Sequence, residues 1–178
     1  MTIMKIAQVG EQILKTPALE VTRFDDDLRD FADNLLVTML EAKGIGIAAT
    51  QVFDPRAIMI MASKPNARYP TAPEMEPLLL INPRILEQGG EQIKDWEGCL
   101  SVPGIRGLVK RNCYVKIEYQ DIHGHRHTLE WHDFMARIFL HEYDHLIGKT
   151  WLDRVETVAD IVGEAVYMKL MTQARLEH

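Results

Sequence analysis

The stretch that decides the fold is Phe134-Met135-Ala136-Arg137-Ile138-Phe139-Leu140-His141-Glu142-Tyr143-Asp144-His145-Leu146-Ile147-Gly148. It holds no proline and no glycine before Gly148, a residue type that often ends helices, so a continuous helix is predicted over 134–147. His141 and His145, four positions apart, share one helix face, where both imidazoles can reach a single metal ion. Glu142 is then well placed to accept a proton from a water activated by the metal. The segment indicates metal-dependent hydrolysis.

Two histidines do not complete such a site, because a catalytic metal usually has three protein ligands and one open position. Downstream of the motif, Glu156, Glu164 and Glu177 offer carboxylates, and Glu164 is the best placed of them. Upstream, Cys99 offers a thiolate, a strong ligand for iron, zinc, cobalt or nickel. Taken alone, Cys99 could equally be a small buried hydrophobic residue, and the helix an ordinary amphipathic one. The residues by themselves leave the third ligand open.

Length and composition limit the class of protein. The 178 residues suit a single domain, which we expect over 1–175, and Leu176-Glu177-His178 resembles a remnant of a purification tag. A net charge of −6 argues against direct nucleic-acid specificity. No signal peptide or membrane-spanning run is visible, so a cytoplasmic protein without membrane contact is expected.

Apolar periodicity and turn residues predict the order of elements. Helices are expected at 25–43, 134–147 and about 156–175. Strands are expected at 57–61, 78–81, 84–86, 92–95, 113–119 and 127–131, the last two forming a hairpin. The segments 44–51 and 62–77 have loop composition. This order predicts an α+β fold, in which antiparallel strands surround a central metal-binding helix, with N-terminal and C-terminal helices.

Three separate blocks resemble the motifs of the peptide deformylase family, in the family's own order. They are Gly44-Ile45-Gly46-Ile47-Ala48-Ala49-Thr50-Gln51, Glu97-Gly98-Cys99-Leu100-Ser101 and His141-Glu142-Tyr143-Asp144-His145. The resemblance extends from the first helix to about residue 154, with Ile47 where leucine is common. It implies a bacterial hydrolase that removes the formyl group from the N-terminal formyl-methionine of newly made polypeptides and releases formate.

The resemblance also implies roles for particular residues. Metal ligands would be Cys99, His141 and His145, holding Fe²⁺ in the cell and Ni²⁺, Co²⁺ or Zn²⁺ in purified protein. Glu142 would carry the proton. The side-chain amide of Gln51 and the backbone N–H of Leu100 would hold the developing oxyanion.

Substrate binding would be mostly to main chain, with an extended peptide adding to a strand edge. By resemblance, Ile45 and Gly46 would lie on one side of the peptide and the segment 104–107 on the other. The positions expected around the methionine are Ile45, Gly46, Glu97, Gly98, Arg106, Phe134 and Ile138. Phe134, Arg137 and Ile138 could instead be plain helix positions.

Several alternatives stay open. A zinc metallopeptidase would use a downstream carboxylate and could dispense with Cys99, and a catalytically weak paralogue would bind peptides without cleaving them. Asp144 could pair with Arg111 or lie exposed on its helix. Nascent formyl-methionyl peptides are the expected partners. Ribosome docking has weak support, because the last helix is not basic.

Overall fold

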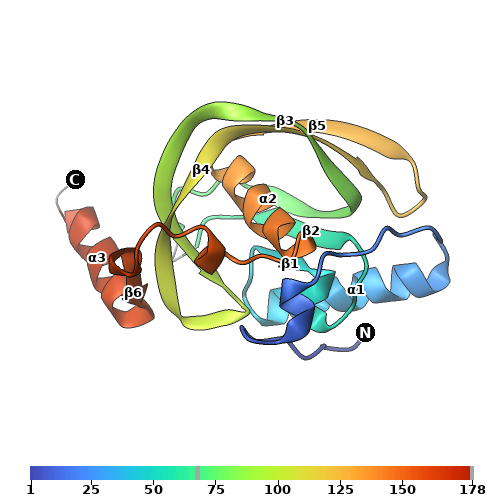
Figure 1. The fold of residues 1–178 in the computed structure, drawn as a ribbon, viewed down its shortest axis with the longest axis horizontal. Coiled ribbons are helices and arrows are strands. Elements are labelled where there is room, and N and C mark those ends of the chain that lie inside the picture. Colours follow the sequence, from blue (N-terminus) through green and yellow to red (C-terminus); the bar gives the residue numbers. More distant parts are fainter. Residues whose placement is uncertain (67–68, 177–178) are drawn as a thin grey trace.

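The computed structural model describes residues 1–66 and 69–176. The helices are α1 Asp26–Glu41, α2 Asp133–Leu146 and α3 Glu164–Leu176. The strands are β1 Gly46–Ala48, β2 Ile58–Ser63, β3 Met75–Cys99, β4 Val102–Gln120, β5 Arg126–His132 and β6 Ile161–Gly163. They pair antiparallel in the order β1-β2-β3-β4-β5, with β6 on β4. The predicted α+β fold is confirmed, and Figure 1 shows α2 enclosed by the curving strands β3 and β4.

Helix α2 is central because its residues from Ala136 to Leu146 are nearly all buried, the polar ones included. Phe139 and Leu140 are buried in a core that includes Met59, Leu80 and Ile117 of the sheet. The helix is followed by Gly148 at φ 73°, where a β-carbon would come within 2.7 Å of the Lys15 carbonyl oxygen. Glycine is therefore required both for the left-handed turn and for the close approach of the N-terminal segment. The predicted helix end is confirmed.

Helix α1 covers β1 and β2 from outside. The Asp25 side chain accepts a hydrogen bond from the Leu28 backbone N–H at 3.2 Å, which caps the N-terminus. Leu28, Leu35 and Met39 are fully buried against a core that contains Ile47. The predicted helix at 25–43 is confirmed, with a slightly earlier end.

Strands β3 and β4 are longer than predicted. The expected strands 78–81, 84–86 and 92–95 are all parts of β3, and β4 begins at Val102 rather than near 113. Asn82, at φ 49°, lies where the register shifts between Ile81 and Arg84. Its side-chain amide donates to the Val21 carbonyl and to Gln120, each at 2.8 Å. These bonds stabilise a bulge within β3, so the strand continues through the turn-like pair Asn82-Pro83.

Two further predictions are corrected. The expected loop 44–51 contains β1 and a 3₁₀ turn over Ala49–Val52, and the expected helix 156–175 begins only at Glu164. Before α3, Ile161–Gly163 pairs with residues 105–107 of β4, which takes these residues out of the helix. The expected tag remnant begins at Leu176, the last residue of α3, and its other two residues lie outside the described part of the chain.

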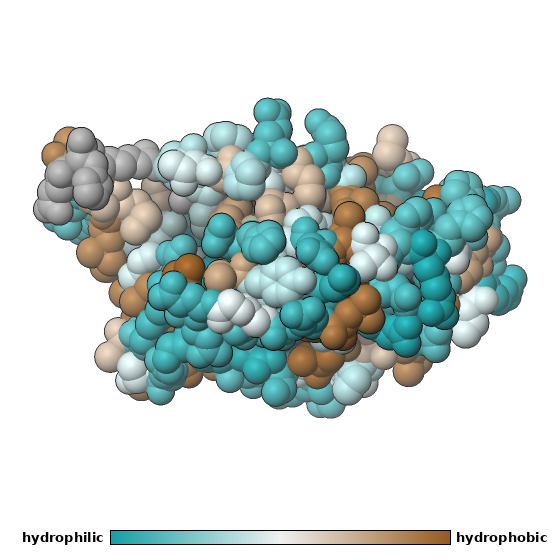
Figure 2. Space-filling model, turned by 90° about the horizontal axis from the view of Figure 1, so that it is seen from above, coloured by the Kyte–Doolittle hydropathy of each residue, from teal (hydrophilic) through white to brown (hydrophobic). Residues whose placement is uncertain are grey.

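The face of the molecule in Figure 2 is largely hydrophilic, with hydrophobic side chains scattered among polar ones. Within residues 1–66 and 69–176, no helix combines the length and the apolar character needed to cross a membrane.

Candidate metal centre and substrate cavity

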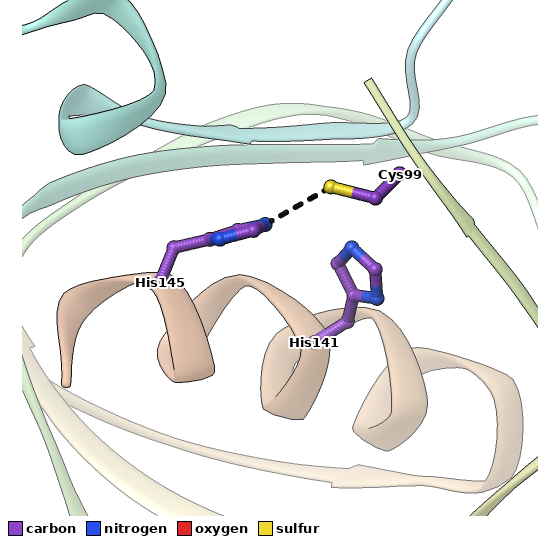
Figure 3. Close-up of side chains that lie close together, drawn as sticks. All are labelled: Cys99, His141 and His145. Atoms are coloured by element: carbon purple, nitrogen blue, oxygen red, sulfur yellow. Dashed lines mark hydrogen bonds between the residues drawn. The ribbon is translucent and has the colours of Figure 1, made fainter. Parts of the chain in front are cut away.

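Three side chains from two elements converge above α2. Cys99 ends β3, whereas His141 and His145 stand on the same face of α2 (Figure 3). Their ligand atoms all lie within 4.8 Å of one another, and the Cys99 Sγ is 3.3 Å from the His145 Nε2. One thiolate and two imidazoles form a donor set suited to Fe²⁺, Co²⁺, Ni²⁺ or Zn²⁺. The residues fit a divalent metal ion.

The two histidines differ in their burial and in the hydrogen bonds of their Nδ1 atoms. The Nδ1 atom of His141 is 2.8 Å from Oε2 of Glu97. This leaves its Nε2 atom to face the metal group, which is the cluster of Cys99, His141 and His145. His145 is fully buried, and burial together with the neighbouring His141 lowers its pKa well below the ordinary value. A neutral ring is the form that binds metal. Its Nδ1 atom has no hydrogen-bond partner in the described part of the chain.

Glu142 lies beside this group as a buried carboxyl, 4% exposed, whose Oε2 has no hydrogen-bond partner among the described residues. Burial, the largest cause, raises its pKa to about 7. A carboxyl with such a pKa exchanges protons readily near neutral pH. The Glu142 carboxyl can therefore act both as a proton acceptor and as a proton donor.

The Gln51 amide is aimed by its own neighbours. The Ala48 backbone N–H donates to its Oε1 at 2.9 Å, which turns the NH₂ group toward the metal group. That nitrogen donates to Ser101 Oγ at 3.1 Å and lies 3.5 Å from the Cys99 Sγ. Sequence reasoning did not single out Ser101, although it is the last residue of the Glu97–Ser101 block.

A buried charge network supports His141 through Glu97. Arg111 donates to both Glu97 oxygens at 2.9 Å, and Arg137 donates to Oε1 at 2.9 Å. Burial opposes the charge of Glu97, but Arg111 and His141 hold its pKa well below the ordinary range. The sequence assigned Arg137 no role in such a network, because a charged residue on a helix face gives no local sign of burial. Glu97, expected from the sequence among the residues around the methionine, thus also contacts His141.

The same network settles the position of Asp144. It is 3% exposed, and Arg111 donates to its Oδ2 at 2.6 Å. Arg154 donates to its Oδ1 at 2.6 Å. The predicted pair with Arg111 is confirmed, and the alternative of an exposed helix charge is excluded.

One cavity of about 1040 Å³ brings the predicted residues together. All the predicted catalytic, metal and substrate residues line it except His145, which lies behind the cavity wall. Ile45 and Gly46 form one side, and Phe134 and Ile138 of α2 another. The cavity also extends along residues 63–66 and 74–77, beyond the predicted set.

The downstream carboxylates do not join the metal group. Glu164 accepts a hydrogen bond from Arg106 at 2.7 Å, and Glu156 accepts from Lys110 at 2.9 Å. Glu177 lies outside the described residues. In the described part of the chain, Cys99 is the third side chain that comes close enough to both histidines.

The two segments expected to flank a peptide differ in their free edges. β1 is the terminal strand of the sheet path, paired on one edge with β2. Residues 105–107 of β4 already pair with β6. The edge of β1 is therefore the more open one for main-chain hydrogen bonds to an added strand.

The comparisons with known proteins point to one family. The family model described as polypeptide deformylase matches residues 3–160. Peptide deformylase 2 of Nostoc sp. is 44% identical over 172 residues, covering 96% of each chain. Peptide deformylase 2 of Shewanella oneidensis is 50% identical over 151 residues, covering 85% of this chain and 83% of the relative. A Met-Ala-Ser-bound class I type b peptide deformylase from Acinetobacter baumannii superimposes with a TM-score of 0.85 at 42% identity, covering 86% of this chain and 99% of that one.

Proposed function

The chain belongs to the peptide deformylase family, and on that premise we propose which of its residues carry out the reaction. The enzyme removes the formyl group from peptides that begin with N-formylmethionine. The observation that carries the residue assignment is the convergence of Cys99, His141 and His145 beside the buried carboxyl of Glu142, whose Oε2 has no hydrogen-bond partner among the described residues.

Cys99, His141 and His145 would hold a divalent metal ion. Such an ion supplies a Lewis acid that lowers the pKa of water and polarises a carbonyl oxygen. Glu97 keeps the ring of His141 oriented, and the arginines around Glu97 keep that carboxylate charged.

Glu142 takes the proton of the attacking water and later gives it to the departing amine. Its burial and its pKa of about 7 support both steps. Gln51, held with its NH₂ group toward Cys99, donates to the oxyanion that develops on the formyl oxygen, and the Leu100 backbone N–H is the second donor.

The peptide extends along the cavity wall formed by Ile45 and Gly46, where β1 offers a free edge. The methionine side chain enters between Phe134 and Ile138, the apolar residues of α2 that line the cavity. Gly98 lies beside this path, with Glu97 and Arg106.

We propose Fe²⁺ as the metal in the cell, because the set of one thiolate and two imidazoles suits it, with Ni²⁺, Co²⁺ or Zn²⁺ in purified protein. Nascent peptides in the bacterial cytoplasm are the proposed substrates. Contact with the ribosome through α3 would be weak, since that helix carries only two basic residues, Lys169 and Arg175, and begins with the acidic Glu164.

Formate release from formyl-Met-Ala-Ser tests the assignment, with the protein loaded anaerobically with Fe²⁺ or Ni²⁺. We expect the wild-type protein to release formate and Glu142→Gln to lose at least about 100-fold in kcat at unchanged metal content. Glu156→Gln, a surface glutamate paired with lysines, is the matched control and should behave as wild type. Equal activity of Glu142→Gln and wild type would overturn the role of Glu142. Cleavage of unformylated peptide bonds would favour the metallopeptidase alternative.

A further inference from the structure

Arg106 is enclosed in the cavity wall by two flat contacts. Its guanidinium lies against the backbone of Gly98, where a β-carbon would come within 2.8 Å of the Arg106 Cζ. On another side, the Cζ atom is 4.5 Å from the ring centroid of Tyr167 on α3. The residue is only 4% exposed and lines the cavity. The guanidinium plane is thus fixed by a strand backbone and an aromatic ring.

Two hydrogen bonds set the direction of this guanidinium. The Nε atom of Arg106 donates to Oε2 of Glu164 at 2.7 Å, and Nη1 donates to the Tyr69 hydroxyl at 3.0 Å. Glu164 is the first residue of α3, and Tyr69 lies between β2 and β3. A guanidinium has five N–H donors, and these are its two hydrogen bonds within the described part of the chain, so donors remain there for a ligand.

Tyr69 connects this cluster with the methionine pocket. Its ring centroid is 5.0 Å from that of Phe134, and both residues line the cavity. Tyr69 and Tyr167 belong to none of the three motif blocks, and the sequence indicates Glu164 as an alternative metal ligand rather than as a substrate-site residue. α3 and the segment before β3 thereby meet on one arginine of the substrate wall.

We propose that Tyr69, Glu164 and Tyr167 position Arg106 to bind the main-chain carbonyls of the residues that follow methionine in the substrate. The proposal rests on the function proposed above and extends it to α3. These three are positioning residues, since they act through Arg106. The reach of the substrate site therefore includes the C-terminal helix, and longer peptides should depend on it more than short ones.

The test compares kcat and KM for formyl-Met-Ala-Ser and for formyl-methionine amide, which lacks the later residues. In Tyr69→Phe, which keeps the ring but loses the hydroxyl, and in Glu164→Gln, we expect KM for the tripeptide to rise about threefold to tenfold. The kcat value, and the kinetics with the amide, should stay within about twofold of wild type. Tyr114→Phe and Glu156→Gln are matched controls away from the cavity and should match wild type with both substrates.

The background variant Arg106→Gln separates positioning from a general loosening of α3. There, adding Tyr69→Phe or Glu164→Gln should have no further effect on KM, because the positioned group is gone. An equal further rise in KM in this background would overturn the proposal, as would an unchanged tripeptide KM in the single variants. An equal rise in KM with both substrates would also overturn it. A wild-type protein that releases no formate from either substrate would instead count against the proposed function.

Discussion

Gly46 of β1 and Glu142 of α2 lie in such close contact that a β-carbon on Gly46 would be 2.3 Å from the Oε1 atom of Glu142. The next nearest atoms to that β-carbon, at 2.6 and 2.7 Å, are the Cδ and Cγ of the same glutamate. The absence of a side chain at 46 therefore decides where the carboxyl lies. This explains in steric terms why a glycine occupies this position of the strand.

Gly46→Ala should push the Glu142 side chain away from the metal group, because the carboxyl is buried and the backbone of β1 is held by β2. We expect kcat for formyl-Met-Ala-Ser to fall about 100-fold, as a displacement near 1 Å can cost that much. Gly89→Ala is the matched control, since nothing lies within 4 Å of a β-carbon there. Unchanged kcat in Gly46→Ala would contradict this steric account.

Cys99→Ser should reduce bound metal, because a hydroxyl is a far weaker ligand than a thiolate for these ions. Metal content measured by mass spectrometry after dialysis should fall well below one ion per chain, and activity should fall with it. Cys113→Ser, at the other free cysteine, should keep full metal content. Full occupancy in Cys99→Ser would show that the third ligand lies elsewhere.

Arg111→Ala should destabilise the fold strongly, because it leaves Glu97 and Asp144 as buried carboxylates that have each lost a partner. We expect the free energy of unfolding in urea to fall by about 3–5 kcal/mol. In Arg84→Ala, which breaks an ion pair with Glu118 at the surface, the loss should stay below about 1 kcal/mol. Similar losses in both variants would refute the importance of burial.

Glu142→Gln should change how the stability of the metal-free protein depends on pH. In the folded chain, burial raises the pKa of Glu142 from 4.5 to about 7. Between these values the folded state keeps a proton that the unfolded chain has released, so the free energy of unfolding falls as pH rises and stays lower above pH 7. Glu142→Gln lacks this fall in the free energy of unfolding with rising pH. It should match wild type below pH 4.5 and exceed it by up to about 3 kcal/mol near pH 8.

Urea unfolding at a series of pH values, after removal of metal by a chelator, measures this difference. Glu11→Gln, at an exposed glutamate, is the control and should follow the wild-type curve. A stability difference between Glu142→Gln and wild type that does not vary with pH would contradict the raised pKa.

Helices α1 and α2 followed from local sequence. The apolar stripes of α1 and α2 predicted both to within about two residues, because period and end signals such as Asp25, Gly44 and Gly148 are encoded in neighbouring residues. The ends of the strands were harder to predict from the sequence. Asn82 and the Gly89-Gly90 pair resemble turns, yet β3 continues through them because β4 pairs along its length. The three residues of β6 are a strand only because β4 offers them an edge.

The candidate site likewise has features that the local sequence predicts and features that it does not. The helical spacing of His141 and His145 is local, so their shared face could be predicted. Burial of Arg137 could not, because its three partners, Glu97 and the carbonyls of Val109 and Ile93, belong to other elements. Tyr69 was equally hidden, since its bond to Arg106 joins segments that only the folded chain brings together.

The sequence by itself determined which chemistry to propose, because the resemblance of its three blocks to the deformylase motifs implies the ligands, the proton carrier and the oxyanion donors. Only the tertiary structure decided the geometry. It brings the Cys99 Sγ to 3.3 Å from the His145 Nε2, leaves the Glu142 carboxyl buried against Gly46, and places α3 on Arg106. The reason is physical: side-chain chemistry and helical period are local properties, whereas burial and contacts between distant segments arise when the sheet closes around α2.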